Sequence, residues 1–281
     1  MVVRKKRVKK VTPKKRKGKK KKSGSRVKSI KKLSLYAGGI VFVALFFSLF
    51  YLLGIRPYRY MWRKVDEEQI YGVVLPENYE IHGVDISRYQ GKIDWKRLLE
   101  NKYSKHPIHF VFMKATEGGD HIDTTFHSNF FEAKRAGFIR GAYHFFSPTT
   151  CINKQADFYK QTVQLLPGDL PPVLDVEVKG SLSKKELKER VYYWLTDIEK
   201  EYGVKPIIYT SYKFKNKFLS DSIFNQFPYW IAHYYVDSVR YQGKWTFWQH
   251  SDIGKVPGIE KEVDLNVFNG SLLELEQLTI P

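Results

Sequence analysis

An apolar, strand-like run in the middle of the chain, Pro171–Val178, is interrupted by two carboxylates. Because side chains alternate between the two faces of a strand, Asp175 and Glu177 should point to the same side, with Cα atoms roughly 6.6 Å apart. Two acids at the end of a buried strand perturb each other, and one of them can stay protonated near neutral pH. Acid-catalysed bond cleavage needs such a pair, although two surface charges at a strand end, or a helix cap, would give the same pattern.

The elements that must position this pair are predicted by the apolar runs along the chain. Eight runs have the length of a strand, and they cover residues 81–86, 109–114, 139–145, 172–176, 206–209, 229–234, 245–249 and 262–266. Helical patterns lie between the first six, within residues 94–101, 124–136, 152–166, 183–202 and 213–225. The clearest helix begins with a capping box of Ser183 and Glu186 and stops at Gly203. The last two connections are too short and too broken for crossover helices.

Strands that alternate with helices indicate parallel βαβ units. We therefore predict an α/β fold, a TIM-like barrel of eight strands and five helices, (β/α)5(β)3, with an open doubly wound sheet as the alternative. No GxGxxG or GxxxxGK[ST] loop follows a strand, which weakens the nucleotide-binding versions of that sheet. The single cysteine, Cys151, rules out an internal disulfide framework, so the core must stabilise this domain, which we expect to be a monomer.

In such a barrel the working residues lie at the C-terminal ends of the strands. These positions are occupied by Asp85, Glu117, Tyr143, His144, Asp175, Glu177, Tyr209, Trp230, Gln249 and Asp264. Carboxylates and aromatic rings together suit a sugar polymer, because carboxylates supply the acid and aromatic faces stack on pyranose rings. A histidine beside aromatic residues is often a core residue, so His144 has a structural alternative. The sequence contains neither HExxH nor a GxSxG elbow, and we expect no metal and no cofactor.

All of these positions except Tyr209 fall within seven separated motifs. In chain order they are HGVDISRYQGKIDW (His82–Trp95), FMKATEG (Phe112–Gly118), GAYHFF (Gly141–Phe146), LDVE (Leu174–Glu177), YWIA (Tyr229–Ala232), WQ (Trp248–Gln249) and VDLN (Val263–Asn266). Together they resemble the motifs of glycoside hydrolase family 25, the Chalaropsis-type lysozymes, over about residues 81–270. The resemblance implies the same barrel, and hydrolysis of the β-1,4 bond between N-acetylmuramic acid and N-acetylglucosamine in peptidoglycan glycan strands.

The resemblance also implies roles for the residues that match. Glu177 would be the general acid, Asp175 the neighbouring stabiliser, and Asp85 and Asp264 the flanking acids. The other residues at the strand ends, Glu117, Tyr143, His144, Tyr209, Trp230 and Gln249, would bind the substrate. The backbone spacing does not choose between a retaining and an inverting course, and we favour a retaining one in which the substrate's own 2-acetamido oxygen attacks while Asp175 orients it. The alternatives are a glycan-binding barrel without catalysis and a chitinase-like glycosidase.

The net charge of +19 suggests a nucleic-acid ligand until the basic residues are located. Residues 1–32 contain 18 Lys and Arg residues and no acid, whereas residues 66–281 contain 26 basic and 29 acidic residues. The main domain is therefore not basic, and we expect no nucleic acid to bind there. A like-charged block as dense as residues 1–32 cannot collapse, so we predict that it is a disordered tail.

Residues 33–55 contain no charged side chain and, as a helix, are long enough to cross a hydrocarbon core of about 30 Å. A cleaved signal peptide is the alternative, but its apolar region would run only about 7 to 15 residues and end in a small-x-small site. The excess of basic residues on the N-terminal flank keeps that flank in the cytoplasm. We therefore expect a single-pass cell-membrane protein, with a linker over residues 56–79 and the barrel domain, residues 80–281, on the periplasmic or cell-wall side.

Overall fold

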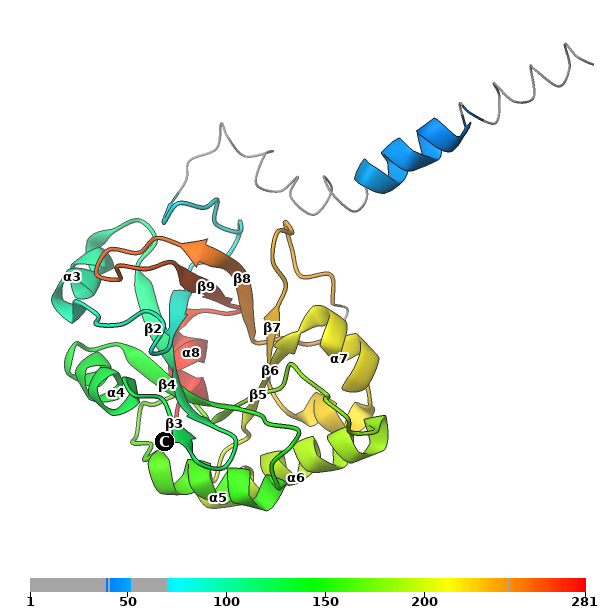
Figure 1. Ribbon diagram of the computed structural model, residues 1–281. Coiled ribbons are helices and arrows are strands. Elements are labelled where there is room, and N and C mark those ends of the chain that lie inside the picture. Colours follow the sequence, from blue (N-terminus) through cyan, green and yellow to red (C-terminus); the bar gives the residue numbers. More distant parts are fainter. Residues whose placement is uncertain (1–38, 40, 52–69, 242) are drawn as a thin grey trace, which may run out of the picture. The chain divides into compact units, whose positions relative to one another are not determined.

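The computed structural model describes residues 39, 41–51, 70–241 and 243–281 (Figure 1). The chain divides into two compact units, residues 1–57 and residues 58–281. In the first unit, residues 41–50 are helical. None of the helices in the described ranges is long and apolar enough to cross a membrane. Of the predicted span 33–55 only residues 39 and 41–51 are described, while the predicted tail, 1–32, and residues 56–69 of the predicted linker lie outside the described residues.

The second unit is a closed barrel of eight strands (Figure 1). The strands are β1 (His82–Ile86), β2 (Ile108–Glu117), β4 (Ile139–Phe145), β5 (Val173–Asp175), β6 (Ile207–Ser211), β7 (Tyr229–Ala232), β8 (Phe247–Gly254) and β9 (Val263–Phe268). They neighbour one another in the order β1-β9-β8-β7-β6-β5-β4-β2, and β2 pairs with β1, which closes the ring. A two-residue strand, β3 (His121–Ile122), pairs with the end of β2. The predicted barrel is confirmed, and the open sheet is excluded.

The direction of the last strand differs from the expected parallel arrangement. All neighbouring pairs from β1 through β2, β4, β5, β6 and β7 to β8 are parallel. Strand β9, in contrast, runs antiparallel to both β8 and β1. Only residues 255–262 connect β8 to β9, and a parallel crossover needs a dozen or more residues. The chain therefore returns directly beside β8, and the start of β9 lies at the same end of the barrel as the C-terminal end of β1.

Helices that follow the strands in sequence surround the barrel (Figure 1). They are α3 (Trp95–Glu100), α4 (Phe126–Arg135), α5 (Ile152–Thr162), α6 (Lys184–Tyr202) and α7 (Tyr212–Phe218), and short 3-10 turns, η2 (Asn101–Tyr103) and η3 (Ser222–Gln226), follow α3 and α7. The predicted capping box of Ser183 and Glu186 is present at the start of α6, and Gly203 ends that helix in the left-handed region with φ 73°. A sixth helix, α8 (Leu272–Leu278), follows β9 and was not predicted.

Two apolar layers stabilise the barrel. The larger lies between strands and helices and includes Val84, Val111 and Trp194. The smaller fills the barrel interior with large aromatic side chains, among them Phe110 and Phe112. Room for these two rings depends on glycine: a Cβ at Gly83 would lie 2.3 Å from the ring of Phe110, and one at Gly141 would lie 2.5 Å from the ring of Phe112. The interior is thus a packed core over the described strands.

Residues 70–79, which we assigned to the linker, contribute to the outer layer. Tyr71, Val73 and Leu75 are buried in it, and the backbone oxygen of Tyr71 accepts a hydrogen bond from the backbone nitrogen of Lys255 at 2.7 Å. The ring of Tyr79 lies edge-on to Trp248, with ring centroids 5.9 Å apart. This segment therefore packs against the barrel beside β8.

Candidate active site

A small cavity of about 90 Å³ lies at the C-terminal end of the barrel. Every barrel strand except β2 contributes to it, and its lining consists of Asp85, Tyr143, Asp175, Glu177, Tyr209, Trp230, Gln249 and Asp264. Eight of the ten predicted site residues are thus brought together. Parallel strands end at one edge of a sheet, and closure into a ring turns that edge into a circle around the cavity.

Asp175 and Glu177 lie on one side of their strand, as the alternation predicts. Asp175 is the last residue of β5, and the backbone nitrogen of Val176 still donates to Tyr209 at 2.9 Å, so the extended conformation continues to Glu177. Only 6% of the Asp175 surface is exposed, whereas Glu177 is exposed at the mouth of the cavity.

Burial raises the pKa of the Asp175 carboxyl well above its usual value, and the charge of Glu177 raises it further. Partial desolvation in the mouth also raises the pKa of Glu177. The pair therefore retains a proton at a pH where isolated carboxyls would be ionised. Within the described part of the chain, Asp175 Oδ1 is buried and has no hydrogen-bond partner. This oxygen is free to accept a hydrogen bond from a ligand.

A network of amide side chains holds Asp85. Its Oδ1 accepts hydrogen bonds from Gln249 Nε2 at 2.9 Å and from Asn266 Nδ2 at 2.7 Å. Hydrogen bonds to the amide oxygens fix the orientation of both side chains. Gln249 Oε1 accepts from the hydroxyls of Tyr209 and Tyr234, and Asn266 Oδ1 accepts from Trp230 Nε1. The network places two N–H donors on one carboxylate oxygen and so favours the ionised form of Asp85.

The two remaining predicted residues do not line the cavity. Glu117 ends β2 and forms an ion pair with Lys114, whose Nζ lies 2.7 Å from Glu117 Oε2. His144 is fully buried on the opposite face of β4, where its ring stacks on Trp194 with centroids 5.8 Å apart. Both of its ring nitrogens have partners, Thr116 at 2.7 Å and Gln155 at 3.1 Å. His144 therefore occupies the layer between sheet and helices, where it does not face the cavity, because it follows the inward-facing Tyr143.

Three residues of the site were missed. Asn266 and Tyr234 belong to the hydrogen-bond network, and the charge of Lys114 lowers the pKa of both Asp175 and Glu177. Alternation of side chains along a strand could have indicated Asn266 and Tyr234. Asn266 follows Asp264 by two residues and Tyr234 follows Trp230 by four, so each is expected on the same face as the site residue before it. Lys114 lies on the same face as Phe110 and Phe112, within a run that we assigned only by its apolar character.

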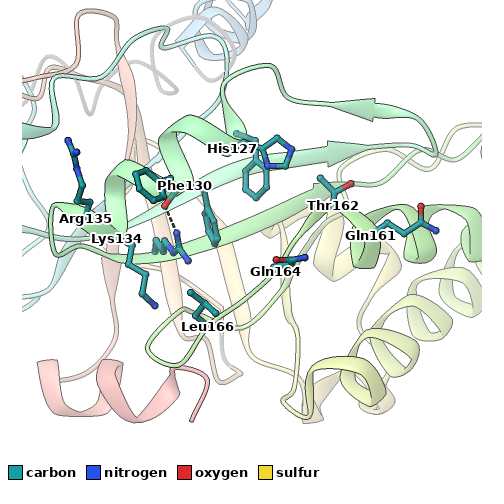
Figure 2. Close-up of a pocket in the computed structure, with 11 residues that line it drawn as sticks. His127, Phe130, Lys134, Arg135, Gln161, Thr162, Gln164 and Leu166 are labelled. Carbon is teal, nitrogen blue, oxygen red and sulfur yellow. Dashed lines mark hydrogen bonds between the residues drawn. The ribbon is translucent and has the colours of Figure 1, made fainter.

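A larger pocket, of about 660 Å³, lies away from these carboxylates, between α4 and the segment that follows α5 (Figure 2). Its lining includes Phe130, Lys134, Arg135 and Leu166 but neither Asp nor Glu. Without a carboxylate, it lacks the pair of acids that cleavage of a glycosidic bond ordinarily uses. The small cavity is the candidate active site because its four carboxyls lie together at the end of the barrel where the parallel strands terminate.

Comparison with known proteins adds an independent finding. The family model described as "Glycosyl hydrolases family 25" matches residues 84–259. The chain is 45% identical to protein YegX of Escherichia coli K12 over 207 residues, which cover 73% of this chain and 76% of YegX. It is 32% identical to lysozyme M1 of Streptomyces globisporus, with 69% and 70% of the two chains covered. The structure of a family 25 glycosyl hydrolase from Bacillus anthracis superimposes with a TM-score of 0.66 at 34% identity, covering 73% of this chain and 95% of that one.

Proposed function

The chain belongs to glycosyl hydrolase family 25, and we propose that it is a peptidoglycan muramidase, which cleaves the β-1,4 bond between N-acetylmuramic acid and N-acetylglucosamine. The observation that carries the proposal is the gathering of four carboxylates, Asp85, Asp175, Glu177 and Asp264, in one cavity at the C-terminal end of the barrel. The similarity to lysozyme M1 of S. globisporus supports the choice of bond.

In the proposed mechanism Glu177 donates a proton to the leaving-group oxygen. Its position suits this role, because it is exposed at the mouth, where a glycan strand can reach it, and its raised pKa keeps a proton available. The 2-acetamido oxygen of the substrate attacks the anomeric carbon, while Asp175 accepts the hydrogen bond of the acetamido N–H. The unpartnered Oδ1 of Asp175 supports this orienting role. The configuration at the anomeric carbon is then retained.

Asp85 and Asp264 hold the substrate and tune this pair. Both lie in adjacent strands at the wall of the cavity, and the charge of Asp85 contributes to the raised pKa of Asp175. Tyr143, Tyr209 and Trp230 supply aromatic surface beside the carboxylates, and Glu117 ends the neighbouring strand β2. We assign these residues to substrate binding.

The identity of the product tests the proposal. Purified peptidoglycan is digested, the new reducing ends are reduced with borohydride, and the resulting sugar alcohol is identified. A muramidase yields reduced N-acetylmuramic acid, whereas cleavage of the other glycosidic bond yields reduced N-acetylglucosamine and would overturn the assignment. Chitin oligomers assayed in parallel measure the chitinase-like alternative. The anomeric configuration of the first product, followed by NMR, tests the retaining course.

We further propose that residues 33–55 anchor the enzyme in the cell membrane, with residues 1–32 in the cytoplasm and the barrel outside, where it remodels the cell wall as a monomer. The support is the charge asymmetry around an uncharged 23-residue segment. Recovery of the full-length protein in the membrane fraction, with the barrel digested by protease added outside, is the expected result. A soluble protein shortened at its N-terminus would contradict the anchor.

A further inference from the structure

The mouth of the candidate active site is rich in carboxyl groups, of which Asp85 and one member of the Asp175–Glu177 pair carry negative charge. Four carboxyls line the cavity, Glu117 lies beside it, and the nearby Lys114 is paired with Glu117 at 2.7 Å. If the proposed function holds, the substrate is also acidic, because a muramyl unit carries a carboxylate either on its lactyl ether or on the stem peptide attached to it. Like charges at such a mouth repel the substrate unless cations nearby compensate.

One such cation, Arg88, lies two residues after the end of β1. Arg88 lies three residues after Asp85 and is exposed. Its backbone nitrogen donates to Asp123 Oδ2 at 2.8 Å, which fixes the turn, and its Nη1 lies 3.3 Å from His121 Nε2. Among the described residues no carboxylate forms an ion pair with its guanidinium. Arg88 lies near the end of β2, since its charge, after the larger effect of Lys114, contributes to the lowered pKa of Glu117, the last residue of that strand.

A second cation lies on the segment that enters β9. Lys261 precedes Asp264 by three residues, and its Nζ lies 5.0 Å from the ring centroid of Tyr89, which is 70% exposed. A hydrogen bond connects the segment after β1 to the segment before β9, since Gln90 Nε2 donates to the backbone oxygen of Glu262 at 3.0 Å. Glu260 and Glu262 flank Lys261 in sequence, yet neither forms an ion pair with it in the described part of the chain.

We infer that Arg88 and Lys261, together with the exposed ring of Tyr89 between these segments, form a cationic rim that receives the carboxylate of the muramyl unit. Arg88 lies three residues after Asp85, just beyond the end of β1, and Lys261 lies three residues before Asp264, just ahead of β9. Both therefore belong to the end of the barrel that holds the cavity, where the substituents of a bound sugar can meet them. The tyrosine ring offers an apolar face to a sugar ring or to a peptide side chain. This inference rests on the proposed muramidase function and names the feature of the substrate that the site selects.

The test compares three forms of the full-length protein, assayed in detergent. The first is the wild type, and the second carries both Arg88→Gln and Lys261→Gln. The third, Lys102→Gln, is a matched control, because Lys102 also lies over an exposed tyrosine, with its Nζ 4.8 Å from the ring centroid of Tyr103. That pair follows α3 and precedes β2, so it lies at the opposite end of the barrel from the cavity.

Three substrates are digested: peptidoglycan, the same material with its carboxylates converted to neutral amides, and glycan strands stripped of stem peptides, which keep a free lactyl carboxylate. For native peptidoglycan the double variant should raise KM about fivefold, since an exposed ion pair contributes little individually, with kcat changed less than twofold. Amidation of the substrate should raise the wild-type KM similarly and abolish the difference between wild type and double variant. Lys102→Gln should match the wild type throughout.

The stripped strands identify the source of the carboxylate. A difference between wild type and double variant that persists on them assigns the lactyl carboxylate, and one confined to stem-bearing material assigns the stem peptide. Equal KM values for wild type and double variant on native peptidoglycan, while the wild type releases reducing ends, would overturn the rim and leave the muramidase function standing. Absence of release by the wild type on every substrate would overturn the proposed function itself.

Discussion

Asp85 and Asp264 lie directly opposite each other on the antiparallel strands β1 and β9. Burial raises the pKa of both carboxyls, and each is raised further by a neighbouring carboxylate, that of Asp264 by Asp85 and that of Asp85 by Glu177. Asp85 accepts two amide N–H groups on one oxygen, which stabilises its charge. Asp264 is therefore the member of the pair that keeps a proton at neutral pH.

Asp264→Asn tests this assignment through stability. Because the folded-state pKa of Asp264 is raised above its unfolded value, the wild type loses stability as the pH rises from the unfolded pKa toward the folded one. Asparagine does not titrate, so the variant should gain roughly 1 to 3 kcal/mol of unfolding free energy relative to wild type between pH 5 and pH 8, measured by urea denaturation. The exposed Asp120→Asn is the control. A difference for Asp264→Asn that does not change with pH would contradict the assignment of a proton to Asp264.

Tyr234→Phe tests the network behind Gln249. The hydroxyls of Tyr209 and Tyr234 both donate to Gln249 Oε1 and so direct its nitrogen toward Asp85. Loss of one of the two donors should lower kcat about two- to tenfold, as expected for a single hydrogen bond, with a smaller effect on KM. The neighbouring hydroxyl of Tyr235, which donates to Asp252 Oδ1 at 2.7 Å, provides the control Tyr235→Phe. Equal losses in the two variants would show that the network does not position Asp85.

The position of the site could be predicted because it depends on local rules. Asp85, Asp175 and Tyr209 each lie at or near the end of an apolar run, and the parallel strands bring these ends to one circle. Alternation also predicted that Glu177 would share a side with Asp175, although β5 ends at Asp175 itself. The same rule argues against placing both Tyr143 and His144 in the cavity, because adjacent residues of a strand face opposite sides.

Features that depend on distant contacts could not be predicted. The pairing of β1 with β2 and the reversal of β9 are set by closure of the ring, which no single window of sequence records. In the sequence, Asn266 is one polar residue within a strand. Its role depends on hydrogen bonds to Trp230 and Asp85, which lie far from it in the chain. Helix α8 is a different case: it is only seven residues long, too short to give a clear helical period, although a capping box of Ser271 and Glu274 marks its start.

Two buried histidines predict sensitivity to acid. His82 and His250 are almost completely buried, and burial first, then neighbouring histidines, lowers the pKa of His82 to about 4 and that of His250 to about 3. In the unfolded chain both would take up protons near pH 6.5, so the folded protein loses stability as the pH falls below that value.

His250→Leu removes one of these groups. Relative to the variant, the wild type should lose roughly 2 kcal/mol of unfolding free energy between pH 7 and pH 5, measured by urea denaturation at the two values. The exposed His127→Leu should show a much smaller change. If His250→Leu and wild type lose stability in parallel over this range, His250 is charged in the folded protein and the account of its burial is wrong.

The most direct test of the central claim compares wild type with Glu177→Gln on purified peptidoglycan. Release of reducing ends should fall by about two to four orders of magnitude in the variant, since a positioned general acid contributes that much, while sedimentation with the cell wall is retained. Glu189→Gln, an exposed change on α6, should keep the wild-type rate. A Glu177→Gln protein as active as wild type would contradict the assignment of the acid, and a wild type that binds the wall but releases nothing would contradict the enzyme itself.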